Sequence, residues 1–167
     1  MSFKVAIVMG SKSDLPIMQK AADVLSDFGI GYELRVMSAH RTPHVALDFA
    51  ENAAKNGFSA IIAGAGGAAH LPGVMAGLST LPVIGVPINS TISTMDGLDS
   101  LLSIVQMPSG VPVASVAVDG AKNAGILAAQ IVGVASKEVA QKLIEFKLKM
   151  KEDVEASDAE NKVIKTV

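Results

Sequence analysis

Two adjacent side chains, His40 and Arg41, are the residues of this sequence best suited to catalysis on an anionic substrate. An imidazole can exchange a proton near neutral pH. A planar guanidinium forms paired hydrogen bonds with a phosphate or carboxylate, and the chain has only two arginines. The alternative is a capped loop with a solvated arginine. His44 and Arg35 lack a comparable context, and we assign them no role.

Two further segments could surround a small ligand. The sequence GSKSD at residues 10–14 offers backbone amides and hydroxyls for a phosphate or polyol, although Ser13 or Asp14 could equally cap a helix. The sequence GAGGAAH at residues 64–70 fits G-x-G-x-x-A, but no acidic residue follows about 20 positions on, which argues against NAD. The segment is therefore interpreted as an uncharged surface that a small ligand approaches closely. His70 either points into this surface or is a structural histidine with its hydrogen bonds satisfied within the protein.

The elements that must position these segments alternate between short apolar runs and helical periodicity. Alternation of this kind is typical of parallel βαβ units, and it predicts a doubly wound parallel sheet of about five strands. Ligands bind such sheets beyond the carboxyl ends of the strands, so the three segments should converge on one edge. Thr42 is expected to cap the second helix, with Pro43 as its first residue. We expect strands at 3–9, 32–37, 59–63, 82–86 and 111–118, and helices at 15–28, 43–56, 71–78, 97–106, 121–134 and onward to about 153.

Composition excludes several classes of protein. The 167 residues carry 14 Lys and Arg against 16 Asp and Glu, a balance that argues against binding to a nucleic-acid backbone. Half of the residues are apolar, which excludes a disordered chain, and there is no cysteine for a disulfide or thiolate. No charge occurs between Lys55 and Asp96, but glycines and prolines divide that interval into pieces too short to cross a membrane. Because the sequence begins with an apolar strand and not with the three regions typical of a signal peptide, we expect no signal peptide and a cytoplasmic protein.

Four motifs in order resemble the N5-carboxyaminoimidazole ribonucleotide mutase family, the class I catalytic subunits of phosphoribosylaminoimidazole carboxylase. They are GSKSD (10–14), SAHRTP (38–43), GAGGAAHLPG (64–73) and SIVQMP (103–108), and the similarity runs from about Lys4 to Gln130. The resemblance implies a flavodoxin-like three-layer α/β/α fold and a homo-octamer. It also implies that no metal, ATP, biotin or other cofactor takes part. The family reaction moves a carboxylate from the exocyclic nitrogen of the ribonucleotide to ring carbon four during purine (IMP) biosynthesis.

The resemblance also implies roles for individual residues. His40 becomes the general acid/base, because one histidine can protonate the carbamate nitrogen and later remove the proton from the ring carbon. Ser11, Asp14 and Arg41 would hold the ribonucleotide, with Arg41 on the phosphate and Asp14 on the ribose hydroxyls. Ser38 would orient His40 or the migrating group. The pocket for carbon dioxide or the carboxylate would be lined by Gly64, Ala65, Gly66, Gly67 and His70.

Two loops depart from the family pattern. Residues 88–97 form a longer loop than usual and residues 118–123 a shorter one, which bears on loop geometry and subunit contacts rather than on the reaction. Direct carboxylation of aminoimidazole ribonucleotide with carbon dioxide is the nearest alternative function. A non-catalytic flavin- or nucleotide-binding module on the same fold is another, and the scarcity of aromatic residues argues against a stacked flavin.

We expect one catalytic domain at residues 1–153, including the charged C-terminal helix, and a flexible tail at residues 154–167. Residues 134–167 carry seven lysines and seven acidic residues, which favours a solvated helix face. The expected partners are the small ribonucleotide and further copies of the chain, without nucleic acid or membrane.

Overall fold

A five-stranded parallel sheet forms the centre of the protein, whose computed structural model describes residues 3–165. The strands are β1 (Lys4–Met9), β2 (Gly31–Val36), β3 (Phe58–Gly66), β4 (Val83–Ile88) and β5 (Ala114–Ser115). Their order across the sheet is β2-β1-β3-β4-β5, which is the doubly wound order of flavodoxin-like folds. The predicted fold class is confirmed. The order reverses between β1 and β3, and this is the point at which such sheets bind ligands.

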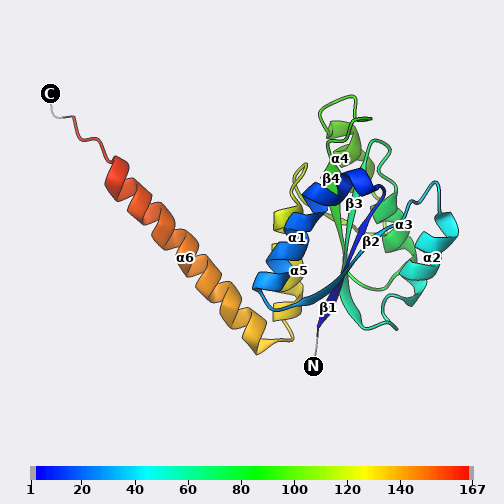
Figure 1. Cartoon of the computed structure of the whole chain (residues 1–167), viewed down its shortest axis with the longest axis horizontal. Helices are drawn as coiled ribbons and strands as arrows, with labels where there is room; N and C mark the ends of the chain where they lie inside the picture. Colours follow the sequence, from blue (N-terminus) through cyan, green and yellow to red (C-terminus); the bar gives the residue numbers. More distant parts are fainter. Residues whose placement is uncertain (1–2, 166–167) are drawn as a thin grey trace.

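Helices cover both faces of the sheet (Figure 1). One face carries α1 (Leu15–Asp27), which follows the short 3-10 turn η1 (Lys12–Asp14), together with α5 (Ala121–Gly133). The other face carries α2 (Pro43–Asn52), α3 (Leu71–Leu78) and α4 (Leu98–Val105). The C-terminal helix α6 (Lys137–Asn161) packs on α5. The result is a three-layer α/β/α architecture.

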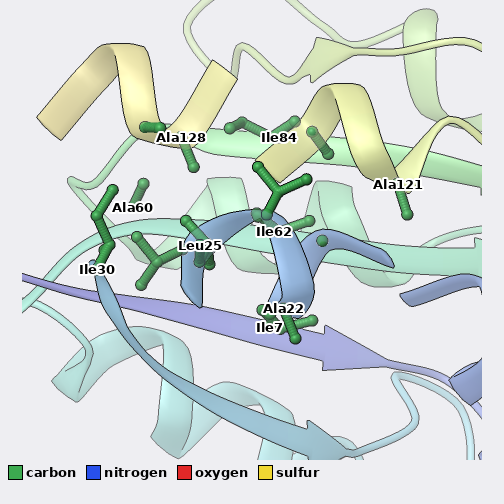
Figure 2. Packing of buried hydrophobic residues seen from close by; sticks show 14 of the residues in the cluster. Ile7, Ala22, Leu25, Ile30, Ala60, Ile62, Ile84, Ala121 and Ala128 are labelled. Carbon is green, nitrogen blue, oxygen red and sulfur yellow. The ribbon is translucent and has the colours of Figure 1, made fainter. Parts of the chain in front are cut away.

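Alternating side chains of the central strands supply two separate cores. Ile7 of β1 and Ile62 of β3 pack with Leu25 of α1 and Ala128 of α5 on one face (Figure 2). Val8, the next residue of β1 after Ile7, belongs to the core on the opposite face. Because successive side chains of a strand point to opposite faces, a strand that is apolar throughout must be covered on both sides. Continuous apolar runs therefore predicted the buried strands.

Two strands differ in length from the prediction. The structure extends β3 as far as Gly66, where it still pairs with Ile88 of β4, so the expected turn at residues 64–70 begins three residues later. The fifth strand was predicted at residues 111–118, but only Ala114–Ser115 is paired. Pro112 has no N–H for a ladder, and an edge strand has a partner on one side alone. Apolar composition therefore overestimated β5.

Helix α6 continues to Asn161, past the predicted end near Asp153. Nothing between these residues is glycine or proline, and ion pairs four residues apart, such as that between Lys151 and Glu155 at 3.5 Å, support the helix. Its first half is attached to the body, where the rings of Phe146 and Phe28 meet edge to face. Its second half projects away from the body (Figure 1). Residues 166–167 of the predicted tail lie outside the described residues.

None of the helices within residues 3–165 combines the length and the apolar character that crossing a membrane requires.

Candidate functional site

A cleft of about 360 Å³ opens at the carboxyl edge of the sheet, at the switch in strand order. Parallel pairing places Met9 of β1 between Val36 of β2 and Gly64 of β3, so the loops that follow these strands emerge side by side. The predicted convergence of the three segments is confirmed. The lining comprises Gly10, Ser11, Ser13, Asp14, Ser38–Arg41, Ala65, Gly66, Ala68, His70, Leu71 and Ser90–Ile92.

The first wall of the cleft is the turn after β1. Gly10 N donates a hydrogen bond to Gly64 O at 3.2 Å, which ties this turn to β3. The Ser11 hydroxyl caps η1 by accepting from Ser13 N at 3.3 Å. Asp14 occupies the N-cap position of α1, but its side chain makes no capping hydrogen bond. The interpretation of Ser13 or Asp14 as a simple cap of α1 is therefore wrong, and the Asp14 carboxylate faces the cleft instead.

Asp14 is a buried carboxylate, with 4% of its surface exposed. Burial raises the pKa of Asp14, because the charged form loses hydration. Hydrogen bonds from Ser13 and from the Ser11 backbone and the positive charge of Arg41 oppose this effect and favour the ionised form. When ionised, the Asp14 carboxylate can accept hydrogen bonds from the hydroxyl groups of a bound ligand, which would compensate for the hydration lost on burial.

The second wall is the turn after β2, and Ser38 organises it. The Ser38 Oγ accepts hydrogen bonds from the backbone amides of His40 at 3.3 Å and Arg41 at 3.1 Å. Thr42 Oγ1 accepts from Ser38 N at 2.9 Å, so Thr42 does not cap α2 as predicted, although Pro43 is its first residue. The competing bonds to the Ser38 backbone take up the threonine hydroxyl. The turn thus fixes the backbone that carries the imidazole and the guanidinium.

Arg41 joins the first two walls. Its Nη2 donates to Gly10 O at 2.9 Å, across the end of β1. A guanidinium has five N–H groups, so four remain to bind an anion in the cleft. Arg41 and Asp14 carry the formal charges of the lining, one of each sign. The other arginine, Arg35, lies outside this lining and pairs with Glu33 at 3.6 Å.

The two histidines of the cleft are in direct contact. His40 Nε2 lies 2.7 Å from His70 Nδ1, and the rings meet edge to face with centroids 4.9 Å apart. One nitrogen must donate and the other accept, so the pair shares a single proton between the two rings. This contact gives His70 a place in the site, which the sequence had left open between a site residue and a structural histidine. His44 does not line the cleft, in agreement with its having no assigned role.

The glycines of the third wall are required mainly by the packing of the protein on itself. A Cβ at Gly64 would collide with Met18 Sδ, and one at Gly66 would collide with Ser90 Oγ. Ala65, Gly66 and His70 line the cleft, whereas the predicted site residues Gly64 and Gly67 do not. The glycines therefore allow Met18 and Ser90 to pack closely against β3. Within this segment of the main chain, Ala65 and Gly66 are the residues placed to contact a ligand.

The cleft has a fourth wall, Ser90–Ile92 after β4, which was not predicted from the sequence. The longer loop at residues 88–97 had been expected to lie away from the chemistry, but three of its residues line the cleft. The rule that places ligands beyond the carboxyl ends of parallel strands applies to β4 as well as to β1, β2 and β3. Applied to β4, that rule would have predicted that the loop after this strand lines the cleft. The motif at residues 103–108 does not line the cleft of its own chain.

The model of the family described as AIR carboxylase matches residues 4–153 of the chain. The chain belongs to the AIR carboxylase family. Among curated members of this family, the N5-carboxyaminoimidazole ribonucleotide mutase of Thermotoga maritima is 58% identical over 151 residues, which cover 90% of this chain and 87% of that protein. The phosphoribosylaminoimidazole carboxylase of Vigna aconitifolia, a chloroplastic protein, is 53% identical over 150 residues, which cover 90% of this chain and 27% of that protein.

Solved structures give the same result for the fold of this AIR carboxylase family member. The crystal structure of Treponema denticola PurE aligns with a TM-score of 0.86 at 31% identity, covering 96% of this chain and 99% of that chain. Within the part of the chain that the structure describes, no group of three or more histidine, cysteine or acidic side chains is arranged to hold a metal ion.

Proposed function

We propose that the chain converts N5-carboxyaminoimidazole ribonucleotide into 4-carboxy-5-aminoimidazole ribonucleotide, with His40 as the general acid/base. Membership of the family and the mutase relatives support the reaction. The observation that carries the mechanism is the 2.7 Å contact between His40 and His70, beside Arg41 and Asp14 in one cleft.

In the proposed reaction, His40 first donates a proton to the substrate and later accepts one from it. Protonation of the carbamate nitrogen by His40 breaks the N–C bond and releases carbon dioxide, which leaves the neutral amine of aminoimidazole ribonucleotide. Ring carbon four then attacks carbon dioxide, and His40 takes the proton that this carbon loses. The proton count is unchanged, as an isomerisation requires. His70 supports this cycle, because its Nδ1 holds the His40 ring in place and can share the proton between the two steps.

The charged residues of the cleft suit the remainder of the ribonucleotide. Arg41 binds the phosphate with the N–H groups that Gly10 O does not use. Asp14 accepts hydrogen bonds from the ribose hydroxyls, and Ser11 adds a hydroxyl from the same turn. Ser38 already accepts two backbone amides, so its own O–H is free to donate to the migrating carboxylate. Ala65 and Gly66 then form the uncharged side of the carboxylate pocket.

Competing substrates provide the decisive test. The purified protein is given N5-carboxyaminoimidazole ribonucleotide in one assay and aminoimidazole ribonucleotide with bicarbonate in another, and the formation of the 4-carboxy product is followed through the next enzyme of the pathway. Fast turnover of the carbamate at low bicarbonate supports the mutase. Turnover by the second route alone would instead assign direct carboxylation, the activity suggested by the name of the Vigna aconitifolia relative.

We further propose that the chain acts as a homo-octamer in the cytoplasm. Support comes from large apolar side chains that remain exposed on two helices, such as Leu102 and Val105 on α4 and Leu148 on α6. The motif at residues 103–108 begins in the last turn of α4 and includes Val105, and we propose that it completes the site of a neighbouring subunit. Light scattering gives the mass of the assembly, and a monomeric protein with full activity would refute this assignment.

A further inference from the structure

The loop between β4 and α4, residues 89–97, is held by a residue far away in the sequence. Asn89 N donates a hydrogen bond to Asp119 Oδ1 at 3.0 Å, and Asp119 N donates to Pro87 O at 2.8 Å. Asp119 therefore contacts the chain on both sides of Ile88, the last residue of β4. The longer loop at 88–97 and the shorter one at 118–123 thus meet through this residue.

Further hydrogen bonds connect the two ends of the loop, β4 and α4, to each other and to the loop. Ser100 Oγ donates to Ile88 O at 2.9 Å, and Ser93 Oγ reaches the same carbonyl at 3.4 Å. Thr94 N donates to Asp99 Oδ2 at 3.2 Å. With these bonds and the contact to Asp119, the loop is a fixed wall of the cleft.

Ile92 is the apolar residue that this wall presents. Its side chain lines the cleft and is 70% exposed, so its apolar atoms are free to contact a molecule bound there. It lies against Gly67, where an added Cβ would be 2.9 Å from Ile92 Cδ1. Gly67 has a φ of 62°, so both the conformation and the space at this position favour glycine. Ile92 thus adds apolar atoms to the lining of the cleft, and its contact with Gly67 supports it from behind.

The backbone of Asp119 is strained. Its φ is 57°, in the left-handed region, where an L-residue other than glycine is strained and where aspartate and asparagine are best tolerated. Glycine would remove the strain but would also remove the acceptor for Asn89 N. The aspartate is therefore explained by its hydrogen bond to the loop that walls the cleft.

We propose that Asp119 is a positioning residue that holds Ile92 against Gly67, and that this apolar wall retains the carbon dioxide released during the reaction. The inference rests on the proposed function, in which the N–C bond of the carbamate breaks before the new C–C bond forms. Carbon dioxide is small and uncharged, so an apolar barrier slows both its escape and its hydration. Escape leaves aminoimidazole ribonucleotide as a by-product.

The test measures retention of the migrating carboxylate. Substrate labelled with carbon-14 in the carbamate is converted in a single turnover in the presence of unlabelled bicarbonate, and label in the 4-carboxy product is compared with the aminoimidazole ribonucleotide formed. Spontaneous loss in an enzyme-free sample is subtracted. A change that only slows the chemistry lowers the rate and leaves the retained fraction unchanged.

The variants form matched pairs. Asp119→Asn keeps an oxygen acceptor, whereas Asp119→Gly removes it at a left-handed position that glycine tolerates. Ile92→Val keeps an apolar side chain, whereas Ile92→Ser does not. Met95→Ser is the control for an exposed apolar residue of the same loop that does not line the cleft. Hydrogen exchange of the peptide that contains Asn89 reports on the anchor without any need for activity.

We expect Asp119→Gly and Ile92→Ser to raise the ratio of aminoimidazole ribonucleotide to product about fivefold, the effect of losing one hydrogen bond or one apolar contact. Asp119→Asn, Ile92→Val and Met95→Ser should match the wild type, and exchange at Asn89 should rise in Asp119→Gly alone. Equal retention in all variants of an active enzyme would overturn the inference alone. A wild type that converts none of the carbamate would overturn the proposed function as well.

Discussion

Replacing His40 by asparagine tests the centre of the proposed mechanism. The asparagine side chain ends near the position of Nδ1 of a histidine, so it cannot reach His70, which contacts His40 through Nε2 at 2.7 Å. Glutamine at the same position extends to about the place of Nε2 and can restore that hydrogen bond. Neither amide can transfer a proton near neutral pH. The pair of variants therefore separates proton transfer from the positioning of His70.

The structure predicts a large effect on rate and a small one on stability. A positioned general acid or base contributes a factor of about 10² to 10⁴, which corresponds to about 2.7–5.5 kcal/mol of activation free energy. His40 is exposed and belongs to neither apolar core, so its loss should change the free energy of unfolding by about 0.5 kcal/mol or less. Binding of the ribonucleotide should persist, because Arg41 and Asp14 are untouched.

The assay follows single-turnover conversion of the carbamate, with calorimetry of product binding and thermal unfolding as companions. His44→Asn is the matched control, since His44 is exposed on α2 and does not line the cleft. We expect both His40→Asn and His40→Gln to lose rate to a similar extent while His44→Asn stays at the wild-type rate. A rate within tenfold of wild type in either His40 variant would refute the assignment of proton transfer to this residue. Recovery in the glutamine variant alone would show that positioning is its main contribution.

Three other substitutions test the remaining walls of the cleft. Arg41→Ala should weaken ribonucleotide binding about 10- to 100-fold in calorimetry, the effect of losing charge-assisted hydrogen bonds, and unchanged affinity would contradict the phosphate role. Asp14→Asn should bind substrate poorly but be at least as stable as wild type at pH 7. Burial raises the pKa of Asp14, so the wild type loses stability as the pH rises from the ordinary value of 3.8 through the higher folded-state pKa, while the variant does not. Thermal unfolding should show the difference vanish below pH 3.8, and a variant less stable than wild type at pH 7 would contradict it. Gly66→Ala should destabilise by about 1–3 kcal/mol because its Cβ meets Ser90, and adding Ser90→Gly should recover part of the lost melting temperature.

Local patterns predicted much of the fold for clear physical reasons. The helix predicted at residues 71–78 is observed at Leu71–Leu78, with Pro72 in its first turn, where proline is tolerated. Strands β1, β3 and β4 were found because a strand covered on both faces is apolar throughout. The lengths of β5 and α6 were not predicted, because strand pairing and ion pairs along a helix are invisible to an apolar pattern.

By itself the sequence determined which residues could do the chemistry and which edge of the sheet would carry them. His40 and Arg41 follow one strand and His70 follows another, and this order is enough to bring them to the same edge in a parallel sheet. Only the tertiary structure decided that His40 and His70 touch, because the order β2-β1-β3 sets the span between their loops. It also decided that Ser90 packs on Gly66 at the end of β3 and Ile92 on Gly67, and that Asp119 holds the loop which carries Ser90 and Ile92. Contacts between residues distant in the chain depend on the register and spacing of strands, which no local pattern encodes.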